Sequence, residues 1–259
     1  MPSARRRSSH PESLADLADQ GVVVRHADYS DPRSLNEAFA GADRVLLISS
    51  NAVGQRIEQH GNVIDAAREA GVDLIAYTSA PHADTTTMLL AAEHAATERL
   101  ILDSGLDYVF LRNSWYLENY TEQLATTLEH KAILGSAGNG RVSAATRADY
   151  AAAAAAVLAG DGPHHHVYEL GGDTLFTLGE YAETLSGLVG EEIAYVDQPP
   201  AQYQAFLESV GLPAPLAHVM ADSDVAVARG DLPVESGDLS RLIGRPTTGL
   251  ADAIRAALG

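Results

Sequence analysis

The stretch that decides the fold is residues 45–79, VLLISSNAVGQRIEQHGNVIDAAREAGVDLIAYTS. The apolar run at residues 45–48 is typical of a strand buried on both faces, and residues 74–77 predict a second strand. Between them, residues 55–70 carry apolar side chains at helical spacing, and Gly71 ends that pattern. A strand, a helix and another strand in this order predict a βαβ unit with parallel strands.

The same alternation extends outward on both sides of this unit. It predicts further strands at residues 22–24, 108–111 and 167–170, and further helices within residues 11–21, 31–41, 91–103 and 149–158. The predicted fold class is therefore α/β, with a parallel sheet covered by helices on both faces. The rhythm breaks after residue 111, and the part from about residue 175 predicts a smaller, less regular lobe that caps the sheet.

The composition of the 259-residue chain excludes several classes of protein. There is no cysteine, which excludes a disulfide scaffold, thiolate metal sites and a cysteine nucleophile. The chain has 17 Lys and Arg against 35 Asp and Glu, and its net charge of -18 disfavours binding to nucleic acid. No apolar run approaches the roughly 20 residues of a membrane span. We expect a cytoplasmic protein, although the Arg- and Ser-rich residues 5–9 leave a transit peptide open beside a solvated loop.

Polar and aromatic side chains follow each predicted strand, where open parallel sheets bind their ligands. In chain order they are Asp28 and Tyr29, Ser49 and Ser50, Thr78, Ser79 and His82, and then Arg112, Asn113, Trp115 and Tyr116. Such hydroxyls, amides and rings suit the ribose, amide and ring faces of a dinucleotide. Taken singly, each small polar residue is equally well explained as a helix cap, but four successive strand ends together favour a ligand site.

The usual glycine-rich dinucleotide fingerprint is absent. Residues 135–140 are rich in glycine but precede a stretch that favours extended chain, so we expect a turn there. The Tyr-x-x-x-Lys proton relay of short-chain dehydrogenases is excluded, because the single lysine, Lys131, has Thr127 four positions before it. His94 and Glu98 share a helix face and could replace the relay, but a solvated helical pair is the favoured interpretation.

Three consecutive histidines, His164, His165 and His166, invite a metal site. Adjacent side chains point in different directions, and no further ligand lies at a suitable spacing. We therefore expect a solvent-exposed loop at these residues and no metal in this protein.

Eight segments carry a resemblance that covers nearly the whole chain: LLISS (46–50), VGQR (53–56), AYTS (76–79), HAD (82–84), LRNSWYLENY (111–120), AATRADYA (144–151), ADSDV (221–225) and LIGRPTT (242–248). Together they resemble the NAD(P)H:quinone oxidoreductase type 2 enzymes, which are atypical short-chain dehydrogenases of the NmrA-like group. The resemblance implies a Rossmann-like NAD(P)-binding domain and direct hydride transfer from NADPH to a quinone, without flavin or metal. An NmrA-like protein that senses NADP(H), or a degenerate binding protein without turnover, is the alternative.

The domain boundaries follow from the same resemblance. We expect a dinucleotide-binding domain at residues 1–172 and a small α+β substrate lobe at residues 173–259, with residues 114–145 contributing to the lobe. The expected partner is a quinone, with no nucleic acid and no membrane span, and a homodimer is left open.

The resemblance also assigns the cofactor contacts. Arg7 is the nearest candidate for the 2′-phosphate of NADPH, Asp28 and Tyr29 match the adenine side, Ser49 and Ser50 match the segment beside the ribose and nicotinamide, and Tyr77, Thr78, Ser79 and Asn113 match the nicotinamide-side pocket.

Three residues are candidates for the chemistry itself. A quinone that accepts hydride develops negative charge on an oxygen, and Tyr77, His82 or Asn113 could stabilise it. Trp115 and Tyr116 could stack on the planar quinone ring, although packing between the lobes would equally explain them.

The resemblance begins partway into the family pattern. A first strand, a glycine-rich loop and a first helix are expected before residue 3, and in the usual strand order that first strand is central. Without it, the strand near Val22 is expected to be separated from the strand near Val45, and NADPH to bind weakly. A start codon placed too late is favoured over a degraded copy, so we expect the missing segment to be encoded upstream in frame.

Overall fold

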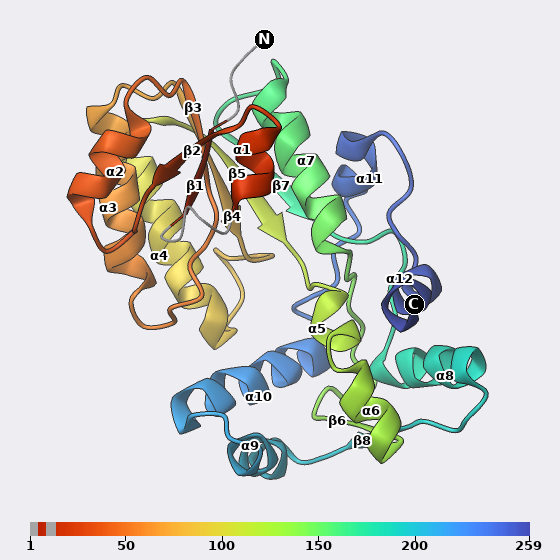
Figure 1. Ribbon diagram of the computed structural model, residues 1–259. Helices are drawn as coiled ribbons and strands as arrows, with labels where there is room; N and C mark the ends of the chain where they lie inside the picture. Colours follow the sequence, from red (N-terminus) through yellow and green to blue (C-terminus); the bar gives the residue numbers. More distant parts are fainter. Residues whose placement is uncertain (1–4, 9–13) are drawn as a thin grey trace.

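The computed structural model describes residues 5–8 and 14–259 (Figure 1). Its main sheet has four parallel strands in the order β3-β4-β5-β7. These strands are β3 (Arg44–Leu47), β4 (Leu74–Ser79), β5 (Asp107–Asn113) and β7 (His166–Leu170). The predicted strands at residues 45–48, 74–77, 108–111 and 167–170 are confirmed, with ends that differ by one or two residues.

Helices cover both faces of this sheet, as the sequence predicts (Figure 1). On one face lie α2 (Pro32–Phe39), α3 (Arg56–Glu69) and α4 (Leu89–Ser104), and on the other lie α7 (Arg147–Ala159) and α11 (Asp238–Ile243). Successive side chains of β4 point to opposite faces of the sheet. Ile75 and Tyr77 belong to the hydrophobic cluster on the face of α2 and α3, and Leu74 and Ala76 belong to the cluster on the face of α7 and α11. All six residues of β4 are buried, so the α/β fold class is confirmed.

A second, two-stranded parallel sheet pairs β1 (Arg5–Ser8) with β2 (Val23–His26), and α1 (Ala15–Asp19) connects them. In the described part of the chain, neither strand pairs with β3, so the expected separation of these strands is confirmed. The unit is anchored through α2, whose Leu35 and Phe39 pack with Leu47 of β3 and Val63 of α3.

One expectation about β3 is wrong. The run at residues 45–48 was expected to be buried on both faces, but Ile48 is 55% exposed and Leu46 is only partly buried. The reason is position, because β3 is the edge strand of the four-stranded sheet. Helix α3 covers Val45 and Leu47 on one face, whereas α7 covers the other face only in part.

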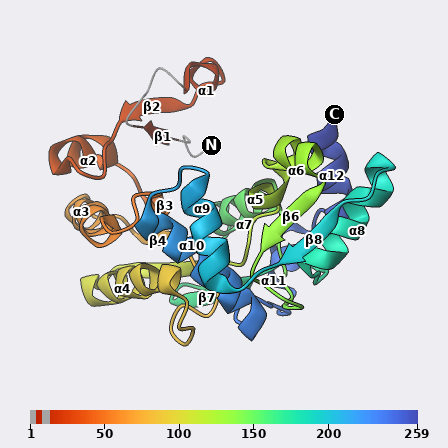
Figure 2. The same cartoon turned by 90° about the horizontal axis from the view of Figure 1, so that it is seen from below.

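The remaining elements gather in the lower part of Figure 1. They are α5 (Glu118–Thr121), α6 (Leu124–His130), β6 (Ala132–Gly135), α8 (Leu178–Val189), β8 (Ala194–Asp197), α9 (Pro200–Ser209), α10 (Ala214–Arg229) and α12 (Leu250–Leu258). In Figure 2, α6, α8 and α12 lie on the right, and α9 and α10 lie in the centre. Strands β6 and β8 pair in parallel, which the sequence did not predict. A hydrophobic cluster that includes Leu117, Val142, Leu185 and Ile254 fills this part. The domain boundary at residue 172 stays a prediction.

Helix α8 is closed at its start by a capping box, in which Thr177 and Glu180 each bond the other's backbone N–H. None of the helices in the described residues is both long and apolar enough to cross a membrane.

Candidate functional site

The side chains that follow the strands lie along one edge of the sheet, because parallel strands end on the same side. Two hydrogen bonds connect neighbouring strand ends. The backbone N–H of Ser49 donates to Thr78 Oγ1 at 2.8 Å, and the hydroxyl of Tyr29 donates to the carbonyl of Ile48 at 3.1 Å. The loops after β2, β3 and β4 therefore form one continuous edge. Ser50 belongs to the same edge, and its Oγ donates to Gln59 at 2.6 Å.

The hydroxyls at the end of β4 all have partners inside the protein. Thr78 holds Ser49, as above, and Ser79 Oγ donates to Glu98 Oε1 at 2.6 Å. Tyr77 is fully buried, its hydroxyl lies 2.9 Å from His94 Nδ1, and burial raises its pKa. These contacts hold the protein's own structure together. A cofactor contact of Thr78, Ser79 and Tyr77 stays a prediction that rests on their position at the end of β4.

Arg112 is the centre of a charged cluster at the end of β5. Its Nε and Nη2 donate to the two carboxylate oxygens of Glu98 at 2.9 and 2.7 Å. Its Nη1 donates to Asp84 at 2.8 Å and to Glu169 at 3.0 Å. One buried cation therefore ties together β5, α4, β7 and the loop after β4.

His82 lies in that loop with a positive φ of 50°. Its backbone N–H donates to Glu169 at 3.1 Å, and its Nε2 lies 3.1 Å from the carbonyl of Pro233. Because a carbonyl only accepts, Nε2 carries a proton. The other ring nitrogen, Nδ1, lies 3.8 Å from Glu169 Oε1. The imidazole is half-buried at the edge of the site.

The expectation of a solvated pair at His94 and Glu98 is wrong. Both side chains are buried, at 6% and 5% exposed. Helix α4 turns this face towards the sheet, where Glu98 meets Arg112 and His94 meets Tyr77 and Arg56. Burial, with Arg56 as a second cause, lowers the pKa of His94 to about 3, so His94 does not act as a proton donor near neutral pH.

Asn113 carries the clearest sign of a missing ligand. Its side chain is 6% exposed, and its Nδ2 lies 3.4 Å from the hydroxyl of Tyr116. Its Oδ1 is buried and has no hydrogen-bond partner among the described residues. Buried amide atoms are nearly always paired, so a donor from outside the chain is expected at this position.

Two aromatic residues flank Asn113. Trp115 is half-buried and packs against the C-terminal hydrophobic cluster. The ring of Tyr116 meets Tyr150 edge-on at 5.3 Å, and the Arg147 guanidinium lies 5.6 Å from its centre. The structure thus brings Asn113, Trp115 and Tyr116 together where the sheet meets the C-terminal elements.

Comparisons with known proteins identify the family to which this chain belongs. Residues 3–161 match a family model described as NAD(P)H-binding. The chain is also 49% identical to quinone oxidoreductase 2 of Escherichia coli, over 95% of this chain and 86% of the relative. This chain belongs to the NAD(P)H-binding family of NmrA-like oxidoreductases.

Solved structures of this family superpose closely on the chain. The NADPH-dependent quinone oxidoreductase of Escherichia coli, complexed with NADPH, matches with a TM-score of 0.95 and 47% identity, over 98% of this chain and 90% of that chain. The triphenylmethane reductase of Citrobacter sp., complexed with NADP(H), matches with a TM-score of 0.91 and 37% identity, over 98% and 90%. The Rossmann-like fold expected from the resemblance is therefore confirmed.

Two family candidates lie on the first small sheet. Arg7 is in β1, paired with Arg25, and its side chain lies outside the described residues. Asp28 follows β2, and its Oδ1 accepts the backbone N–H of Ser30 at 2.8 Å. Asp28 therefore shapes the turn that carries Tyr29 into the edge of the site.

After β6 ends at Gly135, residues 136–140 form a turn, as expected, and residues 141–146 that follow directly are not helical. The successive backbone N–H groups of this turn are filled from within. Those of Ser136, Ala137 and Gly138 donate to Asp224 at 2.7 Å, to the Tyr195 hydroxyl at 3.0 Å and to Asp197 at 2.8 Å. Two carboxylates at these amides leave no room for a phosphate group.

The three histidines differ from expectation in part. His164 and His165 are at the surface, but each contacts one oxygen of Asp107, at 2.7 and 2.8 Å. Hydrogen bonding from His164 lowers the pKa of Asp107. His166 is the first residue of β7. No group of three metal-ligating side chains occurs in the part of the chain that the structure describes.

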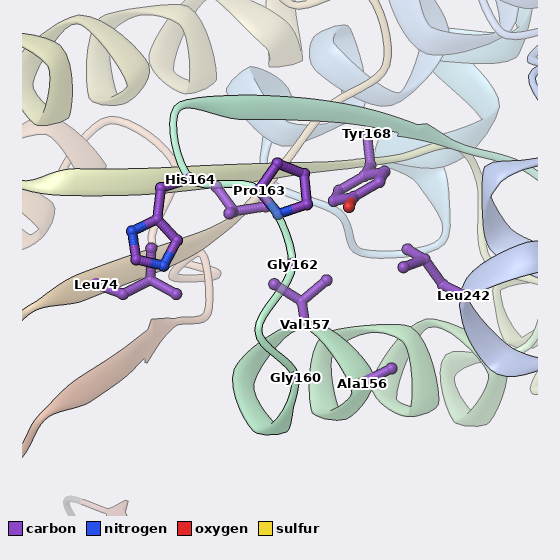
Figure 3. Close-up of a pocket in the computed structure, with 10 residues that line it drawn as sticks. Leu74, Ala156, Val157, Gly160, Gly162, Pro163, His164, Tyr168 and Leu242 are labelled. Atoms are coloured by element: carbon purple, nitrogen blue, oxygen red, sulfur yellow. The ribbon is translucent and has the colours of Figure 1, made fainter.

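The cavity in Figure 3 is not the family's cofactor site. It is lined by Leu74, Val157, His164, Tyr168 and Leu242 among others, and its volume is about 60 Å³. Leu74 is the first residue of β4, so the cavity lies towards the amino ends of the strands, away from Asn113. It is also far too small for a dinucleotide.

Proposed function

We propose that this protein is an NADPH-dependent quinone reductase, which transfers hydride directly to a quinone without flavin. The observation that carries the proposal is the unpartnered, buried amide oxygen of Asn113 at the carboxyl edge of the sheet. The 49% identity to quinone oxidoreductase 2 of Escherichia coli supports the choice of substrate class.

The residues of the edge fit a dinucleotide. Asp28 and Tyr29 would border the adenosine, and Ser49 and Ser50 the ribose. The free Oδ1 of Asn113 would accept the carboxamide N–H of a nicotinamide, which satisfies an otherwise orphaned acceptor.

Three residues with side chains engaged elsewhere complete the proposed pocket. Tyr77, Thr78 and Ser79 hold the backbone at the end of β4, and this strand end would lie beside the nicotinamide. Arg7 would meet the 2′-phosphate, since an arginine favours phosphate through charge-assisted hydrogen bonds.

NADPH supplies the hydride when it is bound. The protein then has to stabilise the quinone oxygen on which negative charge develops. Asn113 Nδ2 and His82 would supply the donors, and Tyr77, which is enclosed, would act through its neighbours. Transfer of one hydride and one proton converts the quinone to a hydroquinone, and water can supply the proton.

Trp115 and Tyr116 would form the wall of the quinone site. Both are half-buried: Trp115 packs against the C-terminal hydrophobic cluster, and Tyr116 packs against the cluster on the sheet. We propose that residues 173–259, with 114–145, form the substrate lobe and residues 1–172 the dinucleotide domain. We further propose a cytoplasmic location, no nucleic-acid partner, and leave a homodimer open.

Calorimetric titration with NADPH and NADH tests the cofactor. The protein should be prepared with any in-frame codons that precede Met1 retained. Tighter binding of NADPH than NADH is expected, and equal binding would contradict the role of Arg7. Tight NADPH binding with no quinone turnover would favour the alternative, a dinucleotide sensor.

A further inference from the structure

We infer that the backbone of Ser50 is held from both sides by two hydrogen-bonded chains of buried side chains. We call these five side chains, Arg56, His94, Tyr77, Thr97 and His60, the Ser50 clamp. The geometry points to a positioning role: the clamp fixes the turn after β3 for the dinucleotide. This inference rests on the proposed function.

One side of the clamp holds the N–H of Ser50. This N–H donates to His60 Nε2 at 3.0 Å, and His60 Nδ1 lies 2.8 Å from Thr97 Oγ1. Thr97 Oγ1 donates its single proton to the carbonyl of Glu93 at 2.8 Å. Thr97 must therefore accept from His60, so the proton of His60 is on Nδ1.

The other side of the clamp holds the carbonyl of Ser50. Arg56 Nε donates to this oxygen at 2.5 Å, and Arg56 Nη1 reaches His94 Nε2 at 3.3 Å. Arginine only donates, so His94 Nε2 accepts and His94 Nδ1–H donates to the Tyr77 oxygen at 2.9 Å.

The two sides of the clamp meet at Tyr77 and Thr97. Burial raises the pKa of Tyr77, and hydrogen bonding with Thr97 opposes that rise. Thr97 itself accepts from His60 Nδ1 and donates to the carbonyl of Glu93. One chain of contacts therefore runs from the carbonyl of Ser50 to Tyr77, and the other runs from the N–H of Ser50 to Thr97.

Burial makes the loss of any one contact of the clamp costly. His60, Thr97 and Tyr77 are 0% exposed, and His94 and Arg56 are 6% and 8% exposed. Loss of one partner would leave a buried polar group unpaired, which is costly. Burial, then Arg56, lowers the pKa of His60 to about 4, which keeps its Nε2 free to accept at neutral pH.

The clamp acts on a turn that leaves the edge of the sheet, where the Ser49 N–H and the Ser50 Oγ are also held by hydrogen bonds. Ser50 follows β3, the edge strand, and the neighbouring Ile48 is 55% exposed. Fixing both backbone groups of Ser50 removes the ordering that a bound ribose would otherwise require. If the clamp had only a core role, the loss of one contact would change stability and leave the NADPH affinity unchanged. The two roles can therefore be separated by experiment.

The first test reads the clamp without any ligand. In long-range ¹⁵N–¹H spectra of the imidazoles, both His60 and His94 should show the Nδ1–H tautomer and should not titrate between pH 5.5 and 8. Exposed His218 and His130 serve as internal references. A His60 that carries its proton on Nε2, or that titrates near neutral pH, would overturn the clamp whatever the protein binds.

The second test reads the positioning role. Thr97→Val keeps the volume and removes the hydroxyl, and we expect the NADPH Kd to rise roughly tenfold with the quinone KM unchanged. Thr97→Ser restores the hydroxyl and should return the Kd to within about twofold of the parent. The control is Ser223→Ala, which removes a buried hydroxyl that likewise bonds the carbonyl four residues earlier in its own helix.

The outcomes separate the two proposals. A raised Kd in Thr97→Val alone supports the positioning role. A Thr97→Val protein that is less stable but binds NADPH like the parent overturns it. If the parent itself binds no NADPH, the proposed function fails, and the tautomers of His60 and His94 still decide whether the clamp exists.

Discussion

At the scale of single residues, Asn113 and its aromatic neighbours separate binding from chemistry. Asn113 sits at the inner end of the edge with one buried amide atom unpaired, whereas Trp115 packs against the C-terminal cluster and Tyr116 packs against Tyr150. A residue that stabilises developing charge affects kcat, and a residue that only walls the site affects KM.

The substitutions Asn113→Ala and Trp115→Ala are expected to differ accordingly. Asn113→Ala should lower kcat with a quinone by roughly 10²-fold, because it removes a donor near the developing oxyanion. It should raise the NADPH Kd to a smaller extent, because it also removes the acceptor of the carboxamide N–H. Trp115→Ala should mainly raise the quinone KM, since it removes a stacking wall. Steady-state kinetics and calorimetry measure both. Parent-like kinetics in both folded variants would contradict the assignment.

The sequence predicts which residues follow the strands, but it does not predict the hydrogen-bond partners of their side chains. The positions of Ser49, Thr78 and Asn113 follow from where strands end. That Thr78 Oγ1 is consumed by the Ser49 N–H depends on the twist between neighbouring strands, which no local pattern contains. The Arg56 and His60 contacts to Ser50 were missed, although their spacing on one helix, four positions apart, was visible.

At the scale of elements, the charged cluster of Arg112 connects strands and helices that the hydrophobic pattern alone leaves separate. Its side chain is 8% exposed and its main partner Glu98 is 7% exposed. Burial alone would lower the pKa of Arg112, but the hydrogen bonds that it donates to Glu98, Glu169 and Asp84 outweigh burial and raise this pKa. Removal of one member would leave a buried charge without its partner.

Arg112→Leu should therefore destabilise the protein by about 3–5 kcal/mol. Urea unfolding followed by circular dichroism measures the loss. The control is Arg255→Ala, which breaks the exposed pair with Asp252 and should cost no more than about 1 kcal/mol. Equal effects of the two substitutions would show that the buried cluster has no special weight.

Element-scale prediction worked where a strand or helix is long and periodic. The β3-α3-β4 unit was read from its apolar runs, and α4 was placed to within two residues. The four-residue strands β6 and β8 were missed because each is only partly buried and finds its partner more than 50 positions away in the chain. The burial of His94 and Glu98 was missed for a related reason. Their hydrogen-bond partners, among them Ser79, Arg112 and Tyr77, lie on strands of the sheet, so the pattern of α4 alone does not show them.

At the scale of the whole molecule, buried ionisable groups make stability depend on pH. The pKa values of His60 and His94 are lowered to about 4 and about 3 by burial, against 6.5 as the ordinary value. The unfolded chain then binds more protons, so their contribution is complete above pH 6.5 and is lost as the pH falls. Asp224 acts in the opposite sense, because burial raises its pKa to about 6.

The protein should therefore lose stability as the pH falls from 7 towards 5, and Asp224→Asn should steepen that loss. The native state holds a proton on Asp224 below about pH 6, which offsets part of the two histidines' effect. The amide retains an acceptor for the Ser136 N–H. Urea unfolding at pH 7, 6 and 5 measures the slopes. A shallower slope in Asp224→Asn would contradict the assignment of its pKa.

Direct hydride transfer from NADPH to a quinone, by this chain's own residues, is tested by the steady-state oxidation of NADPH and of NADPH deuterated at the transferred position. The assay uses a simple quinone and protein free of flavin absorbance, prepared with any in-frame codons before Met1 retained. We expect quinone-dependent oxidation with a primary isotope effect and no requirement for flavin. NADPH binding without oxidation, or oxidation only after flavin is added, would contradict it.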